Sequence, residues 1–229
     1  MYALKFVIRN ALRHRIRTGL TVFGLMVAVL AFGLLQTVVD AWYAGAAASS
    51  STRLITRSAI SLAFTLPMGY EQRIRAVEGV SMVGRSTWFG GIYKEPKNFF
   101  PQFAVSGNYF DLYPEFVMGN EQRQAWMRDR RGVMVGRQLA DQFGFKVGDA
   151  ITLRGTIYQG DWPFVVRGIF EGSDDTKITR HMVFHWDYLN EWLQKRLTRR
   201  ANQTGVFLVG INDATRAAEI SREIGRAHV

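Results

Sequence analysis

The chain has 229 residues, a formal net charge of +10 at pH 7 and no cysteine. The absence of cysteine excludes disulfides, thiolate metal sites and cysteine nucleophiles. Of the 29 lysine and arginine residues, five precede Leu20, so 24 basic residues stand against 19 acidic ones in the rest. The remainder is only mildly basic, and its charge predicts no nucleic-acid partner.

The longest apolar stretch is Leu20–Val39, twenty residues without a charge or a proline. A helix rises about 1.5 Å per residue, so this stretch spans about 30 Å, the thickness of a bilayer's hydrocarbon core. We therefore predict a transmembrane helix over residues 18–43. A signal peptide is the alternative, because Ala44-Gly45-Ala46 resembles a cleavage site, although the apolar core of a signal peptide is typically only about 7–15 residues long.

The flanks of this stretch predict its orientation, because short basic segments stay in the cytoplasm and aromatic rings favour the headgroup level. Basic residues recur every fourth position within residues 1–17, opposite an apolar face, which predicts an interfacial amphipathic helix. A cytosolic extension of the membrane helix is the alternative. We predict a cytoplasmic N-terminus, a main domain outside, and contact with the lipid bilayer through six membrane-anchoring residues: Lys5, Arg9, Arg13, Arg17, Trp42 and Tyr43.

Beyond the anchor, short strands alternate with short helices, which predicts an α+β fold. Ser58–Leu66 has apolar residues at every second position, a pattern typical of a half-buried strand. The other predicted strands are Val80–Val83, Thr87–Tyr93, Gln102–Val105, Gly132–Val135, Ala150–Ile157, Phe164–Phe170, His181–His185 and Val206–Ile211. The predicted helices are Tyr70–Val77, Arg137–Phe143, one capped by Asp187 that ends near Leu197, and Ala214–Glu223 capped by Asp213. Asn108–Tyr113 reads as a turn or short helix, and Asn120–Arg130 as a polar, charged segment.

No residue pattern in the chain predicts catalysis or a cofactor. There is no GxxxxGK[ST] phosphate loop, so we expect no ATP hydrolysis by this chain. His181 and His185 are about 13 Å apart along a strand and have no obvious third ligand, which favours structural histidines over a metal site. Asp174 and Asp175 fit a solvated loop better than a cation site. We predict no catalytic residue, no metal, no cofactor and no enzymatic activity, and we expect three aromatic residues to pack in a core: Trp186, Tyr188 and Trp192.

Four stretches carry a resemblance to a known family. They are RNALRHRIRTGLTVFGLMVAV from Arg9 to Val29, LPMGYEQRIRAVEGVSMV from Leu66 to Val83, GVMVGRQLADQFGFKVGDAITL from Gly132 to Leu153 with FVVRGIFEG from Phe164 to Gly172, and FHWDYLNE from Phe184 to Glu191. In this order behind an N-terminal apolar stretch, they resemble the FtsX-like, MacB-type permease subunits of ABC transporters. The resemblance runs over about residues 4–223.

The resemblance implies a large domain outside the bacterial cytoplasmic (inner) membrane, periplasmic or extracellular, inserted between the first two membrane helices. Residues 44–98 and 177–223 are expected to form a mixed α/β lobe, and residues 99–176 an inserted, β-rich lobe. The implied partners are an ABC-type ATPase and a second permease subunit, as a homodimer or a heterodimer. ATP-driven closure of the ATPases is then expected to move the outer domains and to export or extract a substrate. A single-pass, membrane-anchored extracytoplasmic binding or signalling domain is the alternative function.

The sequence departs from the family pattern after the outer domain. Relatives continue with three membrane helices, which include the loop that contacts the ATPase, and this sequence shows none of them. Residues 224–229, IGRAHV, can be back-translated into a common sequencing-adapter string. We therefore expect a truncated N-terminal fragment whose last six residues are not native, with a genuine short tail as the alternative.

Overall fold

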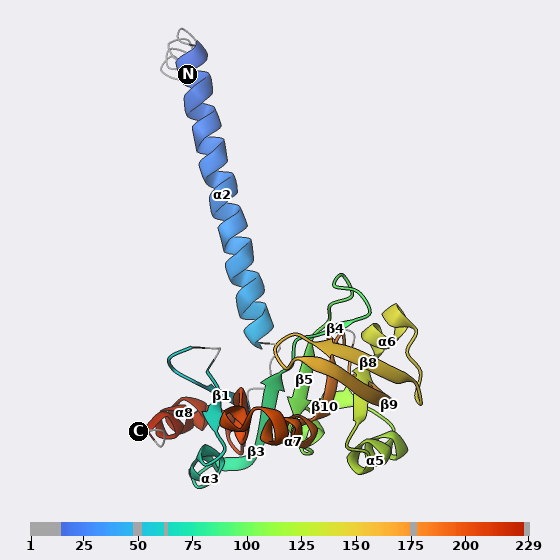
Figure 1. Ribbon diagram of the computed structural model, residues 1–229. Helices are drawn as coiled ribbons and strands as arrows, with labels where there is room; N and C mark the ends of the chain where they lie inside the picture. Colours follow the sequence, from blue (N-terminus) through green and yellow to red (C-terminus); the bar gives the residue numbers. More distant parts are fainter. Residues whose placement is uncertain (1–14, 48–51, 62–63, 175–177, 227–229) are drawn as a thin grey trace. The chain divides into compact units, whose positions relative to one another are not determined.

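The structure is a computed structural model, and it describes residues 15–47, 52–61, 64–174 and 178–226 (Figure 1). The chain divides into two compact units after Ser50. The first unit contains one long helix, and the second is a mixed α/β domain that begins at residue 51, here called the core domain. The α+β class predicted from the sequence is therefore confirmed.

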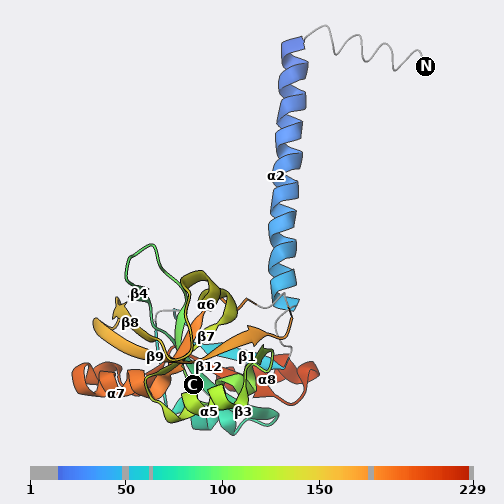
Figure 2. The same cartoon turned by 90° about the vertical axis from the view of Figure 1, so that its right-hand side faces the viewer.

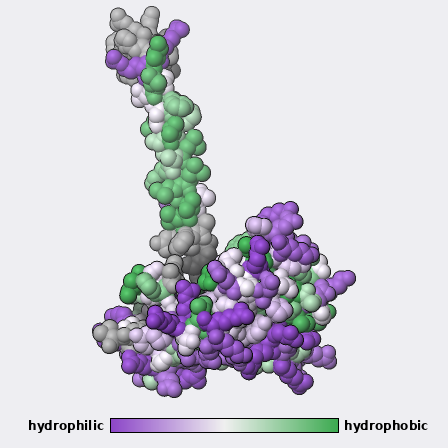
Figure 3. Space-filling view, in the orientation of Figure 1, coloured by the Kyte–Doolittle hydropathy of each residue, from purple (hydrophilic) through white to green (hydrophobic). Residues whose placement is uncertain are grey.

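The first unit contains helix α2 (Arg15–Ala47), 33 residues long and unbroken in both views (Figures 1 and 2). Within it, the side chains of Leu20–Val39 are exposed and mostly apolar (Figure 3). The Thr37 hydroxyl donates to the Gly33 carbonyl at 2.8 Å, so this polar group is satisfied by the helix itself. Residues 18–43, where a transmembrane helix is expected, all lie within α2. Most of the interfacial helix expected over residues 1–17 lies outside the described residues.

The core domain is built on one large sheet. Its strands are β1 (Arg53–Arg57), β3 (Val80–Trp88), β4 (Gly91–Tyr93), β5 (Gln102–Val105), β6 (Phe116–Val117), β7 (Gly132–Gly136), β8 (Ala150–Gly155), β9 (Gly160–Gly172), β10 (Met182–His185) and β12 (Val206–Ile211). The order is β1-β12-β3-β5-β10-β7-β9-β8-β4, with β6 beside β9. Strand β10 is parallel to β5 and β7 is parallel to β9, whereas the other pairs are antiparallel. A separate pair joins β2 (Leu66–Pro67) to β11 (Gln203–Thr204).

Short helices flank the sheet. They are α3 (Tyr70–Arg75), α4 (Tyr109–Leu112), α5 (Asn120–Arg128), α6 (Arg137–Phe143), α7 (Trp186–Arg196) and α8 (Ala217–Arg226), with the 3-10 turns η1 (Thr198–Arg200) and η2 (Ala214–Arg216). Helix α6 lies away from α3, α5 and α7 in both views (Figures 1 and 2). It ends at Gly144, whose φ of 72° lies in the left-handed region that glycine adopts without strain.

Both faces of the sheet centre are covered, because every residue of β7 and β10 is buried. Along β10, Phe184 joins an aromatic-rich cluster that also contains Leu189 of α7, whereas Val183 joins a cluster with Trp126 of α5. Successive strand residues point to opposite faces, so α7 and α5 cover different faces of the sheet. A third group, here called the α8 cluster, contains Leu66, Ile74, Val83, Phe207, Val209, Ile211, Ile220 and Ile224.

The strand expected at Ser58–Leu66 is wrong in its position. In the described part of this segment only Leu66 belongs to a strand, and the strand expected there lies earlier, as β1. The side chains of Ile60 and Phe64 are 85% and 56% exposed. Alternating apolar residues predict a half-buried strand, but the described residues from Ser58 to Thr65 pair with no strand, and only Leu66 pairs, with Thr204 of β11. Strand β1 was missed because three of its five residues are polar.

Three smaller differences concern single elements. The sequence predicts strands at Val80–Val83 and Thr87–Tyr93, whereas the structure has one continuous nine-residue strand, β3, followed by the short strand β4. The polar segment Asn120–Arg130 contains helix α5. Asp187 lies in the first turn of α7 and is not its cap. The cap at Asp213 is confirmed, because its carboxylate accepts from the backbone N–H of Thr215 at 2.8 Å.

The expected lobe boundaries cut across the large sheet. Strand β3 belongs to the expected α/β lobe and pairs with β5, which belongs to the expected inserted lobe. The two-lobe division is therefore a prediction about which parts of one sheet unfold together. Helix α8 continues to Arg226, and Ile224 packs in the α8 cluster. The origin of residues 224–229 remains a prediction.

Candidate functional site

The first candidate site is the apolar surface of α2. Within the described residues, Arg15–Val39 forms one helix that is long and apolar enough to cross a membrane. Its large apolar side chains are exposed, and this amount of contiguous apolar surface is unfavourable in water. Such a helix is stable where lipid or another protein covers it.

The structure places only some of the predicted membrane-anchoring residues. Arg17 lies in the first turn of α2 with an exposed side chain. Trp42 and Tyr43 lie in the last turns of the same helix, beyond the described side chains. Lys5, Arg9 and Arg13 lie outside the described residues. The residues after Val39 remain helical to Ala47, so the helix continues for eight residues past the apolar run.

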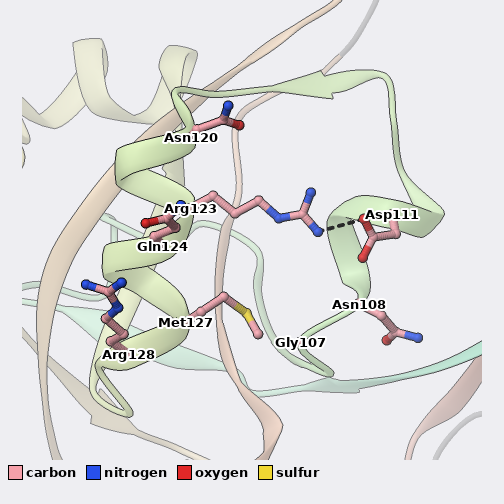
Figure 4. A pocket seen from close by; sticks show the side chains of 8 residues that line it. All are labelled: Gly107, Asn108, Asp111, Asn120, Arg123, Gln124, Met127 and Arg128. Atoms are coloured by element: carbon pink, nitrogen blue, oxygen red, sulfur yellow. Dashed lines mark hydrogen bonds and ion pairs between the residues drawn. The ribbon is translucent and has the colours of Figure 1, made fainter.

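The second candidate site is a cleft of about 470 Å³ between α4 and α5. Its lining residues are Gly107, Asn108, Asp111, Asn120, Arg123, Gln124, Met127 and Arg128 (Figure 4). The guanidinium of Arg123 reaches across the gap and donates to the Asp111 carboxylate at 2.6 Å. The side chain of Met127 points toward Gly107 from the α5 side (Figure 4).

Buried aromatic residues fix the two walls of this cleft. Phe110 of α4 and Trp126 of α5 are buried and meet edge to face, with ring centroids 5.4 Å apart. The side-chain oxygen of Gln122 accepts from the backbone N–H of Ile169 in β9 at 3.0 Å. The walls are therefore held from beneath, and the Asp111–Arg123 ion pair at the surface contributes little to their separation.

A second cavity, of about 370 Å³, shares Asp111, Asn120 and Arg123 with the cleft. The ion pair therefore lies between two hollows on the same surface. The other walls of the second hollow include Phe116, Val117 and Met118. The side chains of Asn120, Gln124 and Arg128 have no hydrogen-bond partner in the described part of the chain, and they are available to a polar ligand such as a peptide backbone.

The two histidines singled out in the sequence pack against aromatic rings. The ring of His185 stacks on Trp126 with centroids 4.2 Å apart, and its Nε2 lies 2.7 Å from the Trp126 carbonyl oxygen and donates to it. His181 contacts Phe116 and Phe170, and burial lowers its pKa to about 4. Burial also lowers the pKa of His185. The described residues contain no group of three metal-ligating side chains.

The aromatic residues of α7 also pack in the core domain. Trp186 is buried, and the guanidinium of Arg85 lies 4.7 Å from its ring centroid. Tyr188 and Trp192 both contact the ring of Trp162. The packing role expected for these three residues is therefore confirmed. The sequence does not reveal the cleft, because the composition of Asn120–Arg130, which forms one wall, indicates a polar, charged segment. Trp126 is the residue in it that indicates a buried helix face.

Comparisons with known proteins bear on most of the chain. The family model for the MacB-like periplasmic core domain matches residues 18–227, which include most of α2 and the core domain. Among solved structures, the chain is similar to the extracellular domain of the noncanonic ABC-type transporter YknZ from Gram-positive bacteria. That match has 14% identity and a TM-score of 0.53, and it covers 76% of this chain and 89% of the other.

The chain is also similar to the periplasmic region of MacB from Actinobacillus actinomycetemcomitans. The identity is 12% and the TM-score is 0.52, with 77% of this chain and 82% of the other covered. A search of curated proteins found no significant match. At these identities the structural likeness establishes the fold of the core domain.

Proposed function

Because the chain belongs to the family of MacB-like periplasmic core domains, we propose that it is a membrane subunit of an ABC transporter. In this proposal α2 crosses the bacterial inner membrane with its N-terminus in the cytoplasm, and the core domain lies outside. A separate ABC-type ATPase supplies the energy, and a second permease subunit, identical or different, completes the transporter. The observation that carries the proposal is that the family match begins inside the apolar helix and continues through the core domain.

The geometry supports a mechanical role for α2. The helix is continuous over 33 residues, and its described part contains no proline or break that would let it bend sharply. In the sequence, β1 follows soon after α2, and β1 pairs with β12 along five residues. A displacement of α2 on ATP binding therefore has a short covalent route to the edge of the sheet. The domain then moves as a rigid body to export or extract a substrate.

The orientation is tested with single cysteines, since the chain has none of its own. Ser173→Cys, at an exposed position of the core domain, should react with an impermeant thiol reagent in intact cells. Ala3→Cys should react only after the membrane is opened. The reverse pattern refutes the proposed topology.

The coupling is tested by purification of the full chain from membranes together with a co-expressed ABC-type ATPase. The two should co-purify, and replacement of α2 by an unrelated membrane helix of equal length should abolish the complex while leaving the chain in the membrane.

The α4–α5 cleft favours the alternative, an anchored binding domain. That alternative is supported if no ATPase associates and if ligand binding by the core domain survives the exchange of α2.

A further inference from the structure

The large apolar side chains that the core domain leaves exposed include a group in β1 and in the described part of the connection from β1 to β2. Ile60 is 85% exposed, the highest value for a large apolar residue in the described part of this domain, and Ile55 and Phe64 are 60% and 56% exposed. Hydrophobic residues are visible at this edge of the domain (Figure 3). A soluble surface rarely gathers such side chains without a partner to cover them.

The surroundings of this group contain a hollow and a cation. A groove of about 520 Å³ lies between β1, the connection and α8, and its walls include Ile55, Ile60, Tyr70 and Ile224. Arg57 also lines the groove, is exposed, and has no acidic partner in the described part of the chain. Apolar, aromatic and cationic side chains on one surface form the composition that favours the headgroup region of a bilayer.

A second copy of the chain is a poor occupant of this edge. Antiparallel self-pairing of β1 about Ile55 sets Arg53 opposite Arg57, and like charges directly opposite each other destabilise a strand pair. Arg53 is moreover already bound to Glu115 at 2.7 Å. The free edge of β1 is therefore unsuited to a symmetric dimer through strand addition.

The length of the connecting chain favours the membrane as the occupant. If Leu20–Val39 fills the hydrocarbon core, the helix continues about 12 Å beyond it to Ala47. The five positions from there to Thr52 add at most about 18 Å. The core domain therefore begins within about 30 Å of the hydrocarbon boundary, and Ile60 follows only eight positions later.

We propose that the side chains of Ile60 and Phe64, beside Arg57, rest in the headgroup region of the membrane in which α2 is anchored. This inference rests on the proposed insertion of α2. The contact would orient the core domain on the bilayer surface. It would also let a displacement of α2 act against a second point of support.

The test uses the full chain, reconstituted in phospholipid vesicles, with one environment-sensitive fluorophore on an introduced cysteine. The labelled variants are Ile60→Cys, Met127→Cys and Val29→Cys. Met127 is a matched control, because it is apolar and 52% exposed but lies on α5. Val29 reports on the insertion of α2. Quenching is measured with lipids that carry a spin label near the headgroup–acyl boundary, and for Val29 with a deep spin label.

The fluorophore at position 60 should lose about half of its emission, since interfacial side chains insert about 5–10 Å into this boundary. The fluorophore at position 127 should be unchanged, and Arg57→Glu in the Ile60→Cys background should reduce the quenching. Equal quenching at positions 60 and 127, or quenching at 29 without quenching at 60, overturns the membrane contact and leaves the anchor intact. Protection of position 60 from an aqueous quencher without lipid quenching assigns a protein occupant and also overturns it. No quenching at position 29 refutes the proposed insertion itself.

Discussion

Replacement of Ile220 by alanine tests whether the core domain unfolds in parts. Ile220 is fully buried in the α8 cluster, where its Cδ1 lies against Gly79. The change removes three carbon atoms, worth about 0.8 kcal/mol each in transfer free energy. The cavity left behind adds to this, so the total cost is about 2–5 kcal/mol of unfolding free energy. The matched control is Ile178→Ala, because Ile178 is 74% exposed and the same deletion there should cost less than about 0.5 kcal/mol.

Hydrogen exchange measured by mass spectrometry on the full chain locates the effect. If the expected lobes unfold separately, exchange in Ile220→Ala should accelerate at Leu54 and Val209, while Ile151 and Val166 keep their protection. These amides lie in β1, β12, β8 and β9, so the comparison spans the sheet from β1, at one end, to β8, the neighbour of the last strand. Equal acceleration at all four positions would refute the two-lobe reasoning, because the sheet would then be one cooperative unit.

Three further changes probe single interactions. Arg53→Met should lower the free energy of unfolding, measured in urea, by about 3–5 kcal/mol. Arg53 and Glu115 are largely buried, with 8% and 18% exposure, and the carboxylate would lose its arginine partner. An unchanged urea midpoint contradicts this. Burial lowers the pKa of His181 to about 4, so the unfolded chain binds the proton more readily, and the thermal midpoint of unfolding should fall as pH drops from about 6.5 toward 4. His181→Phe should weaken this pH dependence. An equally steep profile in the variant would exclude His181 as a cause. A double-mutant cycle with Asp111→Ala and Arg123→Ala should give a coupling free energy below about 1 kcal/mol, since both side chains are about 40% exposed. A coupling well above that value would mean that the ion pair holds the cleft closed.

Elements with a marked end or a clear period were predictable from the sequence. Helix α6 was predicted to the residue, because Gly144 adopts the left-handed conformation that stops it. The apolar run of α2 was evident from length alone. In contrast, β1 has the sequence RLITR, and its partial burial arises from pairing with β12, far along the chain. Ser58–Leu66 carries the pattern of a strand, but among its described residues the fold supplies a strand partner for Leu66 alone.

The candidate sites also differ in how far the sequence alone predicts them. The apolar surface of α2 is a local property, so the sequence revealed it. The cleft depends on the approach of α4 and α5, in which Arg123 meets Asp111 twelve positions away, and no periodicity within either segment encodes that distance. The exposed connection between β1 and β2 was hidden for the opposite reason, because its apolar residues predict burial that the core domain does not supply.

The pairing of β1 with β12 also sets the order in which the domain can be completed. About 150 positions separate these neighbouring strands in the sequence. At a synthesis rate of about 5–20 residues per second, β1 is made roughly 8–30 s before β12, its neighbour in the large sheet. Pairing at this separation is slow to form, because the loop must close before any contact compensates for its entropy. Strand β1, which follows α2 in the sequence, is therefore synthesised before the other described strands of the core domain and is among the last to be ordered. During that interval its unpaired backbone groups and the exposed Ile55 and Ile60 require protection from association with other chains.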